Sequence, residues 1–186
     1  MHKSKSDIRK EVRVRKQALS PLSISAASRE MCGRLEVSPL LRDAQIIVAF
    51  WPMKDEIDIR GYLIKEEALG EKKIYLPVIT GDGVMEFRLF EGEENMAQEP
   101  QFGIWEPTSK EVLLPDEVGD KKLTIIVPGV AFTEKGVRLG RGRGFYDRIL
   151  CAFEGATTIG VCYNCQMYDE LPTDPHDKPI DVVYSI

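Results

Sequence analysis

The chain has 186 residues, of which 43% are hydrophobic and 30% charged, and its formal net charge is −5. These values are typical of one globular domain spanning residues 1–186, and the acidic balance argues against a general nucleic-acid-binding protein. No run is long enough to span a membrane, no signal peptide opens the chain, and the four cysteines form no disulfide pattern. We expect a cytoplasmic monomer whose partners are small molecules, with no nucleic acid and no membrane.

The first third of the chain predicts two helices and a strand. Residues 7–19 place apolar side chains among lysines and arginines at helical spacing, and Ser20-Pro21 ends that helix. A second helix is expected over residues 23–35. The continuous apolar run 46–51 predicts a strand that is buried on both faces.

The remaining elements alternate between helices and strands. Helices are predicted over residues 59–68 and 143–153, and strands over residues 73–78, 84–90, 123–127, 157–161 and 182–185. Residues 81–83 predict the turn of a hairpin, and the polar residues 91–107 predict a loop. This alternation indicates an α/β fold, a three-layer α/β/α, Rossmann-like arrangement with a mostly parallel sheet and helices on both faces.

The most informative segment is residues 137–147, where three glycines alternate with two arginines before an aromatic pair and Asp147. Glycine supplies positive φ and exposes backbone N–H groups, and a helix starting near Phe145 would direct its positive end toward them. Arginine guanidinium groups match phosphate oxygens, and the carboxylate of Asp147 suits a magnesium ion. The segment predicts a polyphosphate site.

Two common glycine-rich motifs do not match this segment. A P-loop would end in Gly-Lys-Ser/Thr, which is missing, and Phe145 occupies the third glycine position of a dinucleotide-binding fingerprint. A solvated turn with incidental arginines remains an alternative, as does an RNA-binding Arg-Gly module. The sequence also leaves open a relative that binds nucleotide or folate without turnover.

The topology predicts where the site lies, since ligands bind beyond the carboxyl ends of parallel strands. Three segments leave predicted strands in this way, at residues 51–56, 128–147 and 162–166. Within the last, Cys162 and Cys165 lack the second pair that a zinc site requires, so we interpret them as free thiols. His176, among Asp174, Asp177 and Asp181, is interpreted as part of a solvated acidic loop, with a metal ligand as the alternative.

With these elements in place, the chain resembles the 5-formyltetrahydrofolate cyclo-ligase family, also called methenyltetrahydrofolate synthetases. Residues 127–132 and 136–147 match the family signature almost position for position. Weaker matches follow in the family's order at residues 5–9, 55–58, 160–166 and 181–183. Phe145 and Arg143 depart from the signature, which more often has tyrosine and lysine there.

The resemblance implies an ATP- and Mg²⁺-dependent conversion of 5-formyltetrahydrofolate into 5,10-methenyltetrahydrofolate. It implies ATP binding by Lys5, Arg9, Arg138, Gly140, Arg141, Gly142, Arg143, Gly144, Phe145, Tyr146 and Asp147. It implies substrate binding by Trp51, Glu56, Arg143, Gly144, Phe145 and Tyr146, with Arg143, Arg141 and Tyr146 as the catalytic residues. It implies that Asp147 and Asp181 hold the metal.

Five of these residues have structural alternatives. Lys5 and Arg9 are four residues apart on one helix face, and they alternatively only solvate that helix. Glu56 alternatively caps the helix that follows it, and Trp51 alternatively belongs to the core. Asp181 is alternatively a turn residue after Pro179-Ile180.

Overall fold

The computed structural model describes residues 3–80, 84–100, 103–175 and 177–186. Its centre is a sheet in the order β10-β9-β6-β1-β2-β3, in which every neighbouring pair is parallel except the antiparallel pair β2–β3. The strands are β1 (Ile46–Val48), β2 (Lys73–Thr80), β3 (Val84–Leu89), β6 (Leu123–Val127), β9 (Thr157–Cys162) and β10 (Val182–Ser185). The expected α/β fold with a mostly parallel sheet is therefore confirmed.

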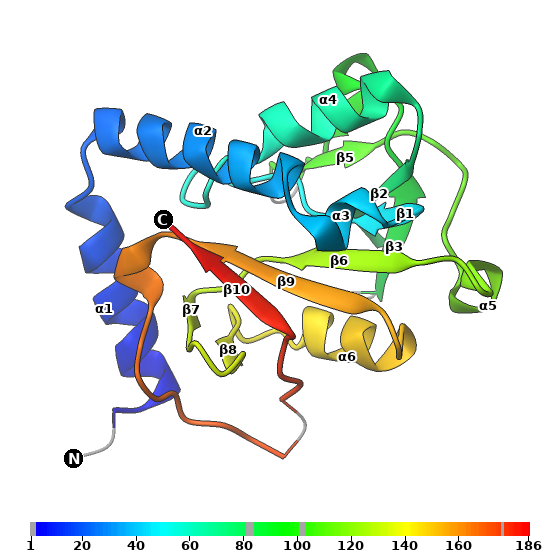
Figure 1. The fold of residues 1–186 in the computed structure, drawn as a ribbon. Helices are drawn as coiled ribbons and strands as arrows, with labels where there is room; N and C mark the ends of the chain where they lie inside the picture. Colours follow the sequence, from blue (N-terminus) through cyan, green and yellow to red (C-terminus); the bar gives the residue numbers. More distant parts are fainter. Residues whose placement is uncertain (1–2, 81–83, 101–102, 176) are drawn as a thin grey trace.

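Helices cover both faces of this sheet, with α2 and α4 on one face and α6 on the other (Figure 1). The helices are α2 (Pro21–Glu36), α3 (Pro39–Arg42), α4 (Arg60–Leu69) and α6 (Phe145–Ala152). Along β1, Ile47 joins the apolar cluster that contains Met31 of α2, whereas Val48 joins the cluster that contains Ile149 of α6. Because alternate residues of a strand face opposite ways, the apolar run of β1 serves two cores.

Helix α1 (Lys5–Gln17) packs beside the sheet rather than over it (Figure 1). Ser4 and Asp7 form a capping box that fixes where the helix begins. Ile8 and Val12 pack against Ala131 and Leu139 of the small sheet formed by β7 (Ala131–Phe132) and β8 (Arg138–Leu139). This contact brings the start of α1 next to the glycine-rich segment.

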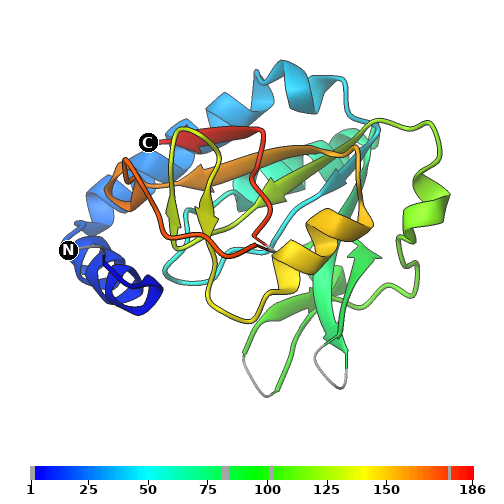
Figure 2. The same cartoon turned by 90° about the horizontal axis from the view of Figure 1, so that it is seen from below.

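The predicted loop over residues 91–107 is wrong, because this region contains a 3₁₀ turn, η2 (Glu93–Asn95), and the antiparallel pair β4 (Met96–Gln98) and β5 (Trp105–Pro107). Figure 2 shows the β2–β3 and β4–β5 pairs projecting side by side from the sheet. The turn predicted at residues 81–83 lies outside the described residues. The short elements α5 (Pro115–Val118) and η3 (Asn164–Gln166) were not predicted either.

Across the described ranges, no helix combines the length and the apolar character that crossing a membrane requires.

Candidate functional site

The site lies in a cavity of about 620 Å³ beyond the carboxyl ends of β1 and β6, which we call the carboxyl-end cavity. Its walls come from the start of α1, the segment after β1, the β2–β3 and β4–β5 pairs, and the glycine-rich segment. Among the predicted site residues, those that line it are Lys5, Arg9, Trp51, Glu56, Arg138, Gly140, Arg141, Gly142, Arg143, Gly144, Phe145, Tyr146 and Asp147. The fold therefore gathers residues that lie more than 130 positions apart in the sequence into one cavity, although their individual roles stay predictions.

Glycine occupies these positions of the segment for different structural reasons. Gly142 and Gly144 have φ values of 101° and 65°, in the region that favours glycine, and Gly144 is the residue from which α6 begins. Gly140 has an ordinary φ, but a Cβ atom there would lie 2.8 Å from Nη1 of Arg138. The segment thus turns sharply into the positive end of α6 while passing close over a buried arginine.

Carboxylates partner the cationic side chains of the cavity. Nη2 of Arg141 contacts Oδ1 of Asp55 at 2.7 Å and Oε1 of Glu56 at 3.1 Å. Nζ of Lys5 contacts Asp174 at 2.7 Å and Asp177 at 2.6 Å. An incoming polyphosphate would therefore replace carboxylates as the partner of these cations.

Arg9 lies on the same face of α1 as Lys5, as its spacing predicts, and it holds the glycine-rich segment directly. Its Nε donates a hydrogen bond to the carbonyl oxygen of Gly140 at 2.9 Å. A Cβ atom on Gly142 would lie 3.4 Å from Nη2 of Arg9. The interpretation that Lys5 and Arg9 only solvate their helix is wrong, because both side chains face the cavity and bind other segments.

Arg138 is the most buried cation of the site, with a side chain only 4% exposed. Its Nη2 donates to Oδ1 of Asp147 at 2.7 Å, and its guanidinium lies 5.6 Å from the ring centroid of Tyr146. Its Nε is buried and has no hydrogen-bond partner among the residues that the structure describes. These contacts fix the carboxylate of Asp147 at the start of α6, where it faces the cavity.

Trp51 and Glu56 occupy the part of the cavity after β1. The ring of Trp51 packs against Phe90 with 5.5 Å between centroids, so it belongs to the edge of the core and to the cavity wall at once. Oε2 of Glu56 accepts a hydrogen bond from the N–H of Met53 at 3.0 Å. Glu56 does not cap α4, because Asp58 accepts the N–H of Arg60 there.

Tyr146 lies close to two charged groups of the site, the guanidinium of Arg138 and the carboxylate of Glu56. Burial, with the nearby carboxylate of Glu56, raises the pKa of its phenol well above the usual value. The hydroxyl therefore stays protonated at neutral pH, and Tyr146 offers the site a ring face and a hydrogen-bond donor rather than a base.

The structure does not support the prediction that Asp181 shares a metal with Asp147. Asp181 immediately precedes β10, and its Oδ2 accepts hydrogen bonds from the N–H and the hydroxyl of Thr158, both at 2.8 Å. Thr158 is near the amino end of β9, so this carboxylate lies at the edge of the sheet opposite the carboxyl-end cavity. We correct the assignment: Asp181 ties β9 to the start of β10.

The third predicted segment, residues 162–166, does not line the cavity. It forms hydrogen bonds with residues that follow β6. The side-chain amide of Gln166 donates to the carbonyl oxygens of Gly129 and Val130 at 2.9 and 3.0 Å. Cys162 and Cys165 are free thiols, as predicted, and burial raises the pKa of Cys162 to about 12. Such a thiol is a poor nucleophile at neutral pH.

Sequence reasoning missed several cavity residues, notably Asp174, Asp177 and Glu106. The interpretation of the acidic loop as merely solvated is wrong, because two of its carboxylates bind Lys5 in the cavity wall. His176 lies outside the described residues. The signal available in the sequence was charge complementarity between a basic first helix and an acidic late loop, which by itself does not specify a contact.

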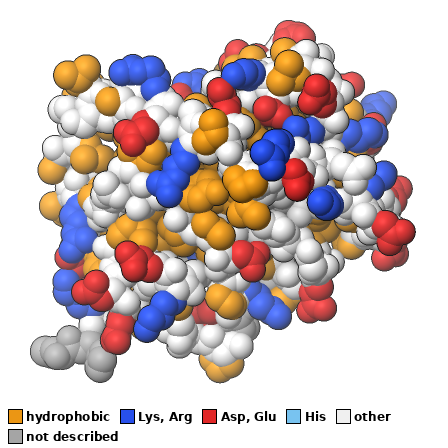
Figure 3. Space-filling model, viewed as in Figure 1, with side chains coloured by type: hydrophobic (Ala, Val, Ile, Leu, Met, Phe, Trp, Pro, Cys, Tyr) orange, Lys and Arg blue, Asp and Glu red, His pale blue; other side chains and the backbone are white. Residues whose placement is uncertain are grey.

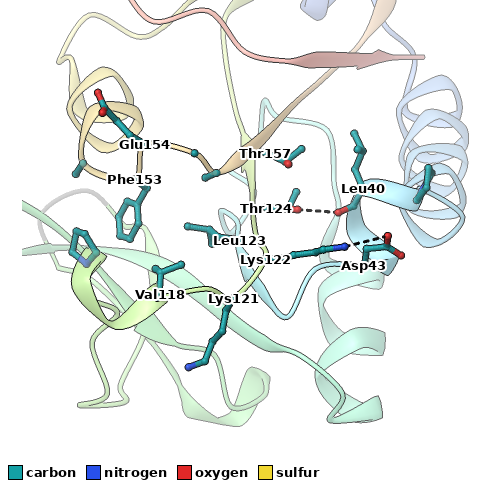
Figure 4. A pocket seen from close by; sticks show the side chains of 16 residues that line it. Leu40, Asp43, Val118, Lys121, Lys122, Leu123, Thr124, Phe153, Glu154 and Thr157 are labelled. Carbon is teal, nitrogen blue, oxygen red and sulfur yellow. Dashed lines mark hydrogen bonds and ion pairs between the residues drawn. The ribbon is translucent and has the colours of Figure 1, made fainter.

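A second cavity, of about 570 Å³, lies at the opposite edge of the sheet (Figure 4). Leu40 and Asp43 line one side of it, and the end of α6 lines another. Two interactions cross it, a hydrogen bond from Thr124 to the carbonyl of Leu40 and a 3.7 Å ion pair between Lys122 and Asp43. None of the predicted site residues lines it, and parallel sheets bind ligands at the other edge.

Comparisons with known proteins show the family to which the chain belongs. A family model described as the 5-formyltetrahydrofolate cyclo-ligase family matches residues 1–185. The 5-formyltetrahydrofolate cyclo-ligase of Haemophilus influenzae is 34% identical over 145 residues, which are 75% of this chain and 74% of that protein.

Two solved structures share the fold. The NMR structure of Aquifex aeolicus 5,10-methenyltetrahydrofolate synthetase superposes with a TM-score of 0.82 and 31% identity, over 97% of this chain and 89% of that one. The 5,10-methenyltetrahydrofolate synthetase of Mycoplasma pneumoniae has a TM-score of 0.75 and 21% identity, over 97% and 98% of the two chains. The sequence match along nearly the full length and these superpositions place the chain in the 5-formyltetrahydrofolate cyclo-ligase family.

Proposed function

We propose that this chain converts 5-formyltetrahydrofolate into 5,10-methenyltetrahydrofolate in a reaction that consumes ATP and requires Mg²⁺. The observation that carries the proposal is that one cavity contains both a basic, glycine-rich segment and an apolar part with Glu56. Arg141 links the two parts through its 3.1 Å contact with Glu56. Such an arrangement suits two ligands that must react with each other.

The chemistry explains why both parts are needed. The formyl oxygen on N5 is a poor leaving group, so N10 does not displace it directly. Transfer of the γ-phosphoryl group of ATP to that oxygen converts it into a phosphate ester oxygen and releases ADP. N10 then attacks the formyl carbon, the five-membered ring closes, and phosphate leaves with the oxygen. No protein nucleophile is required, so positioning and charge stabilisation are sufficient.

Free-energy magnitudes favour several cations acting together. Micromolar binding of a nucleotide requires about 8 kcal/mol, whereas one charge-assisted hydrogen bond contributes about 1.5–3 kcal/mol. We assign the triphosphate to Lys5, Arg9, Arg141 and Arg143, with the N–H groups at the start of α6. Arg138 supports this set by holding Asp147.

Asp147 is the residue that fits a magnesium ion. Among the described residues, no group of three or more histidine, cysteine, aspartate or glutamate side chains gathers to hold a metal unaided. Magnesium does not need one, since it keeps several waters and takes one or two carboxylates together with substrate phosphates. Oδ1 of Asp147 is held by Arg138, which leaves Oδ2 for the ion. The ion would neutralise phosphate charge when bound.

The first experiment is an absorbance measurement of the purified chain with 5-formyltetrahydrofolate, ATP and Mg²⁺. The methenyl product has a longer conjugated system, so absorbance in the near ultraviolet is expected to rise only when nucleotide and metal are both present. Calorimetric binding of folate or ATP without this rise would indicate a relative that binds without turnover.

RNA binding that collapses with added salt would indicate the Arg-Gly alternative. The formal net charge of −5 argues against that alternative. On the face shown in Figure 3, basic and acidic side chains are interspersed. The four free cysteines fit the reducing cytoplasm, where we propose that the chain acts as a monomer.

Glu56→Gln is expected to weaken folate binding about tenfold while ATP binding changes less, because a neutral amide accepts fewer hydrogen bonds from the amino-pyrimidinone ring. Calorimetry with each ligand separately measures the two effects. Asp58→Gln, on the same segment and paired with Arg60, is the control. Equal losses for the two ligands would contradict the assignment of Glu56 to folate.

A further inference from the structure

Five carboxylates line the carboxyl-end cavity, and four of them have a cationic partner. Glu56 pairs with Arg141, Asp147 pairs with Arg138, and Asp174 and Asp177 pair with Lys5. The fifth, Glu106 of β5, makes no ion pair with any residue in the described ranges. Its Oε1 accepts a hydrogen bond from the N–H of Ile79 at 2.8 Å, and Oε2 has no protein partner there.

The surroundings of Glu106 are apolar. Ile79, Met85 and Ile104 line the same part of the cavity. The charged groups that act on Glu106 are Glu99, which directly follows β4, and Arg88 of β3, whose guanidinium contacts Glu86 at 3.2 Å. Burial raises the pKa of the Glu106 carboxyl and Glu99 raises it further, whereas the hydrogen bond from Ile79 and the charge of Arg88 oppose them.

A half-buried carboxylate without a counter-ion costs free energy, and groups of this kind gather at functional sites. Nothing in the fold requires an acid at this position, because the N–H of Ile79 would bond equally well to a neutral amide oxygen. A function of Glu106 would therefore involve a ligand bound in the cavity.

We propose that Glu106 accepts the proton that N10 of the folate loses during ring closure. This proposal rests on the proposed function. In that step the N10 lone pair forms the bond to the formyl carbon, and the carbon–oxygen bond breaks as phosphate leaves. The N10–H bond then breaks, its electron pair stays on nitrogen, and the proton passes to Oε2. A carboxylate paired with arginine or lysine is a weaker base, which disfavours the other four acids.

The test is Glu106→Gln, which keeps the shape of the side chain and an acceptor for Ile79. We expect kcat to fall at least tenfold, while KM for ATP and the thermal unfolding temperature stay unchanged. In the parent chain, turnover should decline at low pH as Glu106 becomes protonated, and this decline should vanish in the variant. Glu106→Asp retains a carboxylate and should retain the pH dependence. Glu94→Gln, which removes an acid from the same region outside the cavity, is the control.

Two results would overturn the proposal. An unchanged kcat and pH profile in Glu106→Gln would show that Glu106 takes no part in the reaction. A raised KM for folate with unchanged kcat would show that Glu106 binds the substrate without accepting its proton. A parent chain with no turnover is a separate outcome, because it would contradict the proposed function itself.

Discussion

Replacing Arg143 with alanine is expected to lower kcat by about 100- to 1000-fold, the usual effect of removing one donor that stabilises transition-state charge. Arg143 lies between Gly142 and Gly144 at the start of α6 and lines the cavity. Arg143 is exposed, so the thermal unfolding temperature should change little. Steady-state kinetics and a thermal melt measure the two quantities.

Two further variants sharpen this prediction. Arg143→Lys keeps the charge with a shorter, single-point donor, so it should retain more activity than the alanine variant. Lys135→Ala removes one exposed positive charge from the neighbouring turn and should leave kcat unchanged. Near-normal turnover in Arg143→Ala would remove Arg143 from the catalytic residues.

Periodicity predicted the buried parts of the fold well, because burial on two faces leaves an unmistakable apolar run. Strand β6 has the predicted bounds, and α2 and α4 differ from their predictions by one or two residues at each end. The β4–β5 pair was missed since its strands are only three residues long. Strands of that kind carry no apolar alternation to read.

The sequence predicts the part of the site that one continuous segment forms. It does not predict the parts where segments far apart in the sequence meet. Residues 140–147 contain their own glycines, arginines and carboxylate, so their grouping in one cavity follows from local sequence. Glu106 and Asp177 enter the cavity from regions that look polar and unremarkable, and only the fold reveals them. Asp181 shows the converse, since its assignment came from resemblance and its hydrogen bonds with Thr158 place it elsewhere.

The ion pairs of the cavity hold its cationic side chains in positions where a polyanion can bind them. Arg141 and Lys5 are each held by two carboxylates, which keeps these long side chains ordered and close to the glycine-rich segment. Because a phosphate would exchange for a carboxylate, binding replaces one charged contact by another and spares the cations a full desolvation cost. Arg138 differs, since its single carboxylate partner is itself the proposed metal ligand.

Arg138→Met is expected to lower the free energy of unfolding by about 3 kcal/mol, because it leaves the carboxylate of Asp147 without its buried partner. The side chain of Asp147 is 20% exposed, so some water reaches it and the cost stays near the lower end of the usual range. For a chain of this size we expect the melting temperature to fall by about 6–12 °C.

The double variant Arg138→Met/Asp147→Asn separates this cause from simple loss of packing. Removing the charge of Asp147 removes the reason for the penalty, so the double variant should unfold at a higher temperature than Arg138→Met alone. Both variants should lack turnover, since neither presents an oriented carboxylate at the start of α6. If the double variant is no more stable than the single one, the ion pair is not what makes Arg138 important to the fold. The contact of its guanidinium with the ring of Tyr146 would then be the main contribution.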